Sequence, residues 1–157
     1  KLERLLRRVE YSKTCKQGPA GVILRKFYGY RFHRLSVRLG MTLPVNVFGP
    51  GLSIAHYGTI VVHAGAKIGR NCRLQEGVTI GATGGSHEAA VIGNNCYFGS
   101  GAKVIGAVRI ADDVAVGANA VVTKDILEAG TTWAGAPAKK ISDKSSRDNL
   151  NQSLFAN

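Results

Sequence analysis

The sequence repeats every six residues from Phe48 onward, and this period constrains the fold more than any single motif. The leading position of the repeat is apolar at Ile68, Leu74, Ile80, Ile92, Phe98, Val104, Ile110, Val116 and Val122. The position four residues later is small or β-branched, at Cys72, Val78, Cys96, Ala102, Val108, Val114, Ala120 and Ile126. Six-residue repeats are typical of a parallel β-helix, in which each repeat buries its apolar face only when neighbouring repeats stack on it. We therefore predict a mainly β fold, a prism whose flat faces suit a long, thin ligand.

The repeat has two registers. Three leading positions are in step with one another but two residues out of step with those from Val62 onward: Phe48, Ile54 and Ile60. This shift predicts an insertion that is absorbed by residues 60–62.

A Gly-rich stretch at residues 82–90 interrupts the pattern and places Ser86 in a leading position. We expect this stretch to project as a loop, and loops on rigid scaffolds often carry functional residues. The repeats end near Leu127, residues 133–141 are expected to close the stack, and residues 142–157 form a polar C-terminal tail.

The N-terminal part of the chain is strongly basic. The net charge is +11, and residues 1–40 hold eleven of the 21 Lys and Arg residues but only two acids. Apolar spacing predicts a helix over residues 1–11 and, after a breaker at residues 18–21, a second helix. We interpret residues 1–40 as a basic helical cap whose charges are solvated. Peripheral contact with a membrane or an anionic saccharide stays open, whereas nucleic acid is not expected because no stacking platform accompanies the charge.

Cysteine use points to a reducing compartment. Cys15, Cys72 and Cys96 form no metal or disulfide pattern, and the last two occupy inward repeat positions, where a free thiol acts as a small apolar group. No run approaches the roughly 18 apolar residues of a membrane span, and no secretory signal is recognisable after Lys1. We predict a cytoplasmic protein.

Two histidines occupy outward positions of the repeat, His56 and His63, while His33 lies in the basic segment and His87 in the expected loop. An outward histidine in a groove is suited to remove a proton from a hydroxyl at neutral pH. An exposed side chain without a role is the simpler interpretation of any one of them.

Four motifs favour a functional role for His56 over an exposed side chain without a role. They lie in order along the chain, at residues 51–62, 66–69, 75–81 and 134–139. Together they make residues 41–141 resemble the hexapeptide-repeat acyltransferases, and within them the serine acetyltransferases. The resemblance implies a left-handed parallel β-helix, here of four to five 18-residue coils. It also implies a homotrimer that holds acetyl-CoA between neighbouring prisms, with no metal.

The resemblance also implies roles for individual residues. His56 matches the catalytic base of the family, and Lys139 and Lys140 would lie near the CoA phosphates, where a positive charge is favourable. The loop residues His87 and Glu88 would contact the acceptor. The coils facing CoA would carry Gly81, Ala82, Gly99, Ser100, Gly117 and Ala118.

The acceptor half departs from the family pattern. The aspartate that orients the base falls fifteen residues upstream, at Met41, and the acid that precedes the base is Ala55. The loop offers His87 and Glu88 where the family has an Arg-His pair. Which group orients His56 is left open by the sequence.

We therefore predict an acetyl-CoA-dependent O-acetyltransferase in which His56 assists direct transfer to serine or a related small hydroxyl substrate. An O-acetyltransferase acting on a sugar of a cell-surface polysaccharide precursor is the alternative. A hexapeptide-repeat metal-dependent lyase, using His56, His63 and His87, or a non-catalytic scaffold are further alternatives.

Overall fold

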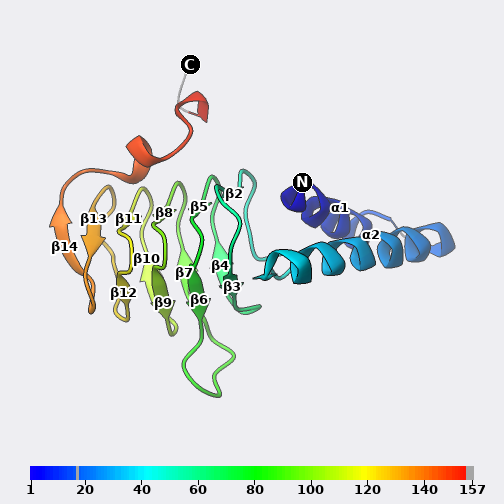
Figure 1. The fold of residues 1–157 in the computed structure, drawn as a ribbon, viewed down its shortest axis with the longest axis horizontal. Coiled ribbons are helices and arrows are strands. Elements are labelled where there is room, and N and C mark those ends of the chain that lie inside the picture. The colour runs from blue at the N-terminus through cyan, green and yellow to red at the C-terminus, as the bar shows by residue number, and fades with distance from the viewer. Residues whose placement is uncertain (17, 155–157) are drawn as a thin grey trace.

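The computed structural model describes residues 1–16 and 18–154 and consists of two helices followed by a stack of short strands (Figure 1). Helices α1 (Leu2–Thr14) and α2 (Gly18–Leu39) pack against each other at one end of the stack. None of the helices in the described ranges is long and apolar enough to cross a membrane.

The strands form three sheets. The five-stranded sheet contains β1 (Met41–Thr42), β3 (Ile60–Val62), β6 (Thr79–Gly81), β9 (Lys103–Ile105) and β12 (Val121–Val122). The three-stranded sheet contains β4 (Lys67–Ile68), β7 (Val91–Ile92) and β10 (Arg109–Ile110). The six-stranded sheet contains β2 (Ser53–Ile54), β5 (Arg73–Leu74), β8 (Tyr97–Phe98), β11 (Ala115–Val116), β13 (Thr132–Ala134) and β14 (Lys139–Ser142).

The chain visits the three sheets in turn, so that residues of one coil pair with those of the next. Leu74 pairs with Phe98 in the six-stranded sheet, and Ile80 pairs with Val104 in the five-stranded sheet, both in parallel register. All four side chains are fully buried in one continuous core. The predicted mainly β fold with parallel sheets and short N-terminal helices is confirmed. Only β13 and β14 pair antiparallel among the described strands, and they close the stack.

The register shift lies in a different place from the one predicted. Ile54 pairs with Leu74 and Val62 pairs with Ile80, so the seven residues between Ile54 and Val62 span the same corner as five residues on the next coil. Strand β3 itself is regular, with alternating burial. The two extra residues therefore enlarge the turn at residues 55–59, which carries His56.

The helix boundaries also differ from the prediction. The expected breaker at residues 18–21 forms the first turn of α2, because Pro19 at the start of a helix loses no intrahelical hydrogen bond. The apolar face of α1 is buried as expected. The loop expected at residues 82–90 is confirmed: it carries no strand and projects from the stack after β6 (Figure 1).

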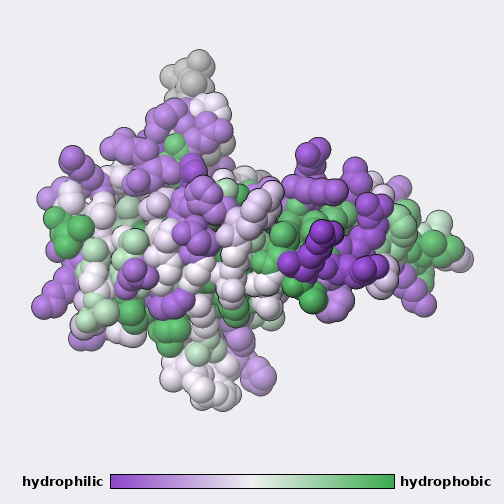
Figure 2. Space-filling view, viewed as in Figure 1, coloured by the Kyte–Doolittle hydropathy of each residue, from purple (hydrophilic) through white to green (hydrophobic). Residues whose placement is uncertain are grey.

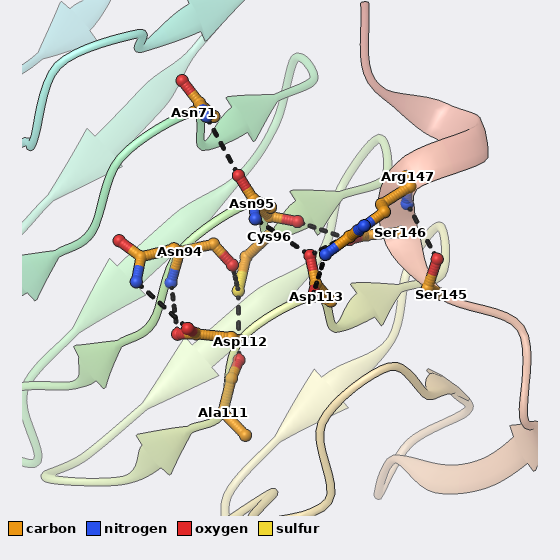
Figure 3. A network of polar contacts seen from close by, with 10 residues as sticks. All are labelled: Asn71, Asn94, Asn95, Cys96, Ala111, Asp112, Asp113, Ser145, Ser146 and Arg147. Carbon is orange, nitrogen blue, oxygen red and sulfur yellow. Dashed lines mark hydrogen bonds and ion pairs between the residues drawn. The ribbon is translucent and has the colours of Figure 1, made fainter. Parts of the chain in front are cut away.

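The C-terminal segment packs back on the coils. Figure 3 shows Asn71 donating to Asn95 and Asn95 donating to Asp113, at 3.0 and 2.9 Å, along one corner of the stack. Each of these residues has a positive φ, a conformation that Asn and Asp tolerate well. Arg147 in the short 3₁₀ helix η1 (Ser146–Asn149) donates two hydrogen bonds to the Asp113 carboxylate. A second 3₁₀ helix, η2 (Gln152–Leu154), follows it.

Acidification should release this segment. Hydrogen bonds from Arg147, and to a smaller extent from Asn95, hold the pKa of Asp113 below its usual value against an opposing effect of burial. A lowered folded-state pKa means that the contribution is complete above about pH 5 and is lost as the pH falls through the lowered value. Amide-exchange protection of Ser146, whose N–H donates to the Asp113 carbonyl, should fall over that range. Asp113→Asn should show weaker protection with no such dependence, and an equal acid response in both proteins would contradict this role.

Candidate active site

His56 lies in a column of stacked turns that lead from the six-stranded sheet to the five-stranded sheet. The turns are residues 55–59, 75–78, 99–102 and 117–120, and we call them the His56 column. The column follows from the strand pairing, since each parallel pair sets one turn on the next.

The enlarged turn places His56 in the wall of a cavity of about 620 Å³ between the helices and the first coil. Met41 and Ala55, which stand where the family has acids, line the same cavity. Arg38 of α2 and Glu3 of α1 also line it. Glu3 is held by the backbone, because its Oε1 accepts a hydrogen bond of 2.8 Å from the N–H of Ile54. The two positions at which apolar residues replace acids of the family therefore line the same cavity as His56.

Glu76 is a neighbour of His56 that the sequence interpretation gave no role. It lies on the next turn of the column, and a β-carbon added at Gly58 would lie only 2.8 Å from the Glu76 β-carbon. The Ser100 hydroxyl and the backbone N–H of Glu76 lower the pKa of its carboxyl, partly offset by burial, and the charge of His56 lowers it further. Coil length could have revealed this pair, since twenty residues are one 18-residue coil plus the two inserted ones.

Small residues continue the column away from His56. A β-carbon at Gly99 would lie 2.7 Å from the backbone nitrogen of Ala118, and one at Gly117 would lie 3.1 Å from the β-carbon of Ala134. Ser100 and Ala118 are their neighbours on the same turns. Four of the six residues predicted to face CoA therefore lie together. Gly81 instead ends β6 and Ala82 follows it, so both lie at the carboxyl ends of the strands of the five-stranded sheet, opposite the turns of the His56 column.

The two lysines at the end of the stack differ in their surroundings. Lys140 Nζ lies 2.5 Å from Glu128 and 2.7 Å from Asp143, and these carboxylates raise the pKa of Lys140. The exposed side chain of Lys139 makes no hydrogen bond or ion pair with residues 1–16 or 18–154. Lys139 is the freer of the two to meet an anion.

The loop residues lie elsewhere in the chain. His87 and Glu88 are exposed on the loop that leaves β6, and neither lines the cavity of His56. The His63 ring accepts a hydrogen bond of 3.1 Å from the N–H of Gly65, which packs against the backbone of the same loop. One chain alone therefore does not bring His56 together with His87 and Glu88.

Neither cysteine of the core is available as a nucleophile. Cys72 and Cys96 are buried, as predicted, and burial raises the pKa of Cys96 to about 12 and that of Cys72 well above its ordinary value. Across the described part of the chain, no three His, Cys, Asp or Glu side chains are grouped so as to hold a metal ion.

Comparison with known families gives a match over residues 89–124 to the family described as bacterial transferase hexapeptide (six repeats). The serine acetyltransferase of Helicobacter pylori is 43% identical over 95 residues, which cover 59% of this chain and 55% of that protein. The resemblance to the hexapeptide-repeat acyltransferases, on the serine acetyltransferase-like branch, is confirmed.

One further relative and one solved structure are similar to this chain. The serine acetyltransferase of Synechococcus elongatus is 35% identical over 95 residues, covering 59% of this chain and 38% of that protein. The crystal structure of serine acetyltransferase from Brucella abortus in complex with coenzyme A shares the fold, with a TM-score of 0.70 and 24% identity over 91% of this chain and 55% of that one. The chain thus spans about half the length, or less, of the curated relatives that it matches.

Proposed function

We propose that the protein is an acetyl-CoA-dependent O-acetyltransferase of the serine acetyltransferase type. The observation that carries this proposal is the His56 column, which starts at a histidine beside a cavity and leads to Ala134, the strand partner of the exposed Lys139. Four steps separate the turn of His56 from Ala134, and strands stack about 4.8 Å apart, so the column extends about 19 Å. A row of small residues of that length suits an extended thioester cofactor.

In the proposed reaction His56 is the general base. Its imidazole removes the proton of the acceptor hydroxyl while the oxygen attacks the thioester carbonyl. Backbone N–H groups at the edge of the coils stabilise the oxyanion. The C–S bond then breaks and the proton passes to the CoA sulfur. No covalent enzyme intermediate is required.

Acetyl-CoA would lie along the small residues of the column. Gly99, Ser100, Gly117 and Ala118 permit close approach because they carry little or no side chain. Lys139 would meet the phosphates, and Lys140, which two carboxylates already neutralise, would contribute less. Gly81 and Ala82 would contact the cofactor from the carboxyl ends of the strands of the five-stranded sheet.

A homotrimer of left-handed β-helices would complete the site. His87 and Glu88 lie away from His56 in one chain, so the loop of a neighbouring copy would have to reach the cavity to contact the acceptor. Light scattering at micromolar concentration should give three times the mass of the chain, and a monodisperse monomer would contradict the assembly. The proposed segments are residues 1–40, 41–141 and 142–157, of which 155–157 lie outside the described residues.

The favoured acceptor is serine or a related small hydroxyl compound, as the serine acetyltransferase relatives suggest. A sugar acceptor is the second candidate, because Met41 and Ala55 remove two acids from the cavity and leave apolar wall in their place. An acceptor screen with labelled acetyl-CoA tests both, using serine beside free and nucleotide-linked sugars. If the protein transfers acetyl to none of these compounds and does not bind CoA, the non-catalytic scaffold is favoured. If the purified protein contains metal, the metal-dependent lyase is favoured.

We also propose a cytoplasmic location with peripheral contact of α2 to an anionic membrane. One face of α2 exposes Ile23, Phe27, Tyr30 and Val37, each at least half exposed. Every charged residue of α2 is basic, and the Arg31 guanidinium lies over the Phe27 ring at 5.3 Å. Figure 2 shows hydrophobic and hydrophilic surface side by side at this helical end. Apolar side chains interleaved with arginines suit the interface of an anionic bilayer, and like charges disfavour a second copy of α2.

Co-sedimentation with vesicles tests this contact. Binding should require phosphatidylserine in phosphatidylcholine vesicles, weaken at high salt, and fall in Phe27→Ser. Equal binding to neutral vesicles, or binding only to an acidic polysaccharide, would contradict it.

A further inference from the structure

The base of the proposed reaction lacks its expected orienting acid. Met41, at the position of that acid, is buried and apolar, and Ala55 cannot serve. Glu3 is the one carboxylate among the side chains that line the cavity, and it accepts a hydrogen bond from the backbone of Ile54. An imidazole that takes up a proton needs a partner which fixes its ring and stabilises its positive charge.

Glu76 lies one coil further along the stack, on the side of the His56 turn that faces away from the helices. The N–H of Ala55 donates to the carbonyl of Leu74, and the N–H of Gly77 donates to the carbonyl of Thr59. These two hydrogen bonds bracket the turns and hold Glu76 directly against the turn of His56. The absence of a side chain at Gly58 is what makes room for it, since a β-carbon there would collide with Glu76.

The Glu76 carboxylate is only partly satisfied by its surroundings. Its Oε2 is shielded from solvent and has no hydrogen-bond partner among the described residues. Buried polar oxygens nearly always have a partner, and one without it is often part of a functional site. The lowered pKa of Glu76, to which Ser100 contributes most and His56 also contributes, keeps the group ionised at neutral pH.

We infer that Glu76 is a positioning residue for His56, holding the imidazole in orientation and stabilising the imidazolium that forms during acetyl transfer. This inference rests on the proposed function. Glu76 itself stays ionised throughout: the proton moves from the acceptor hydroxyl to His56 and then to the CoA sulfur, as the new C–O bond forms and the C–S bond breaks.

Glu76→Gln tests the inference, because glutamine keeps the shape that packs on Gly58 and removes only the charge. We expect kcat to fall about 10- to 100-fold, the range found when the hydrogen-bonded partner of a metal-ligating histidine is lost. The affinity for CoA and the acceptor KM should change little. In the His56→Ala background the same substitution should have no further effect, since Glu76 acts through His56.

Other outcomes of these measurements would overturn the inference. An unchanged kcat, a fall that persists without His56, or a rise in acceptor KM alone would assign Glu76 to structure or to acceptor binding. The ¹⁵N resonances of the His56 ring give a readout without activity: Glu76→Gln should shift them and leave those of His63 in place. If the wild-type protein transfers no acetyl group, the proposed function fails, while the ring resonances still decide whether Glu76 positions His56.

Discussion

Replacing His56 with alanine should lower the rate of acetyl transfer by roughly 10²- to 10⁴-fold, the usual effect of removing a positioned general base. The affinity for CoA should be nearly unchanged, because the small residues of the His56 column and Lys139 lie on later coils. The fold should also persist, since His56 lies on a turn at the cavity wall and not in the core. Steady-state kinetics and CoA titration on the same preparation measure both effects.

His63→Ala is the matched control, because His63 is a second outward histidine on the same coil and does not line the cavity. It should cost far less activity. His87→Ala should mainly raise the acceptor KM if the loop of a neighbouring chain covers the site. Near-normal activity of His56→Ala beside an inactive His87→Ala would move the base to the loop.

Reversing the charge of Lys139 should weaken CoA binding by about 10- to 100-fold, which corresponds to the loss of one hydrogen bond between charged groups. Lys139→Glu removes a cation that is free to meet a phosphate and adds a repelling carboxylate. The weaker binding should appear in a direct titration with CoA and become smaller at high salt, as expected for an exposed charge pair.

Lys140→Glu serves as the comparison. Lys140 already contacts Glu128 and Asp143, so its loss should affect the end of the stack more than CoA binding. A larger effect on CoA from Lys140 than from Lys139, or no effect from either, would remove the assignment of the phosphate to Lys139.

Much of the fold could be predicted from sequence because the signal is periodic. Leu74, Phe98 and Val116 stack in one sheet since each coil buries the same position of the repeat. The loop at residues 82–90 was equally predictable, because glycines and a polar residue replace the inward apolar side chain there. Period alone did not locate the insertion: a two-residue shift in register is compatible with any position between Ile54 and Val62, and backbone pairing decided it.

The candidate site, like the fold, could be predicted from sequence only in part. Sequence motifs predicted His56 as the base and Lys139 as a phosphate contact, and they showed that Met41 and Ala55 stand at the positions of the family's acids. They could not distinguish Lys139 from Lys140, because the carboxylates that neutralise Lys140 come from Glu128, which precedes β13, and from Asp143. Nor did they single out Glu76, although its separation of twenty residues from His56 equals one 18-residue coil plus the two inserted residues.

The sequence by itself determined that this chain coils into a stack of short parallel strands, because a six-residue apolar period buries one side chain per strand on every coil. Only the tertiary structure decided which side chains share a corner of that stack. Stacking brings residues a whole coil apart into contact, and the two residues inserted at 55–59 change which neighbours meet. That is the physical reason why Glu76 lies against the turn of His56.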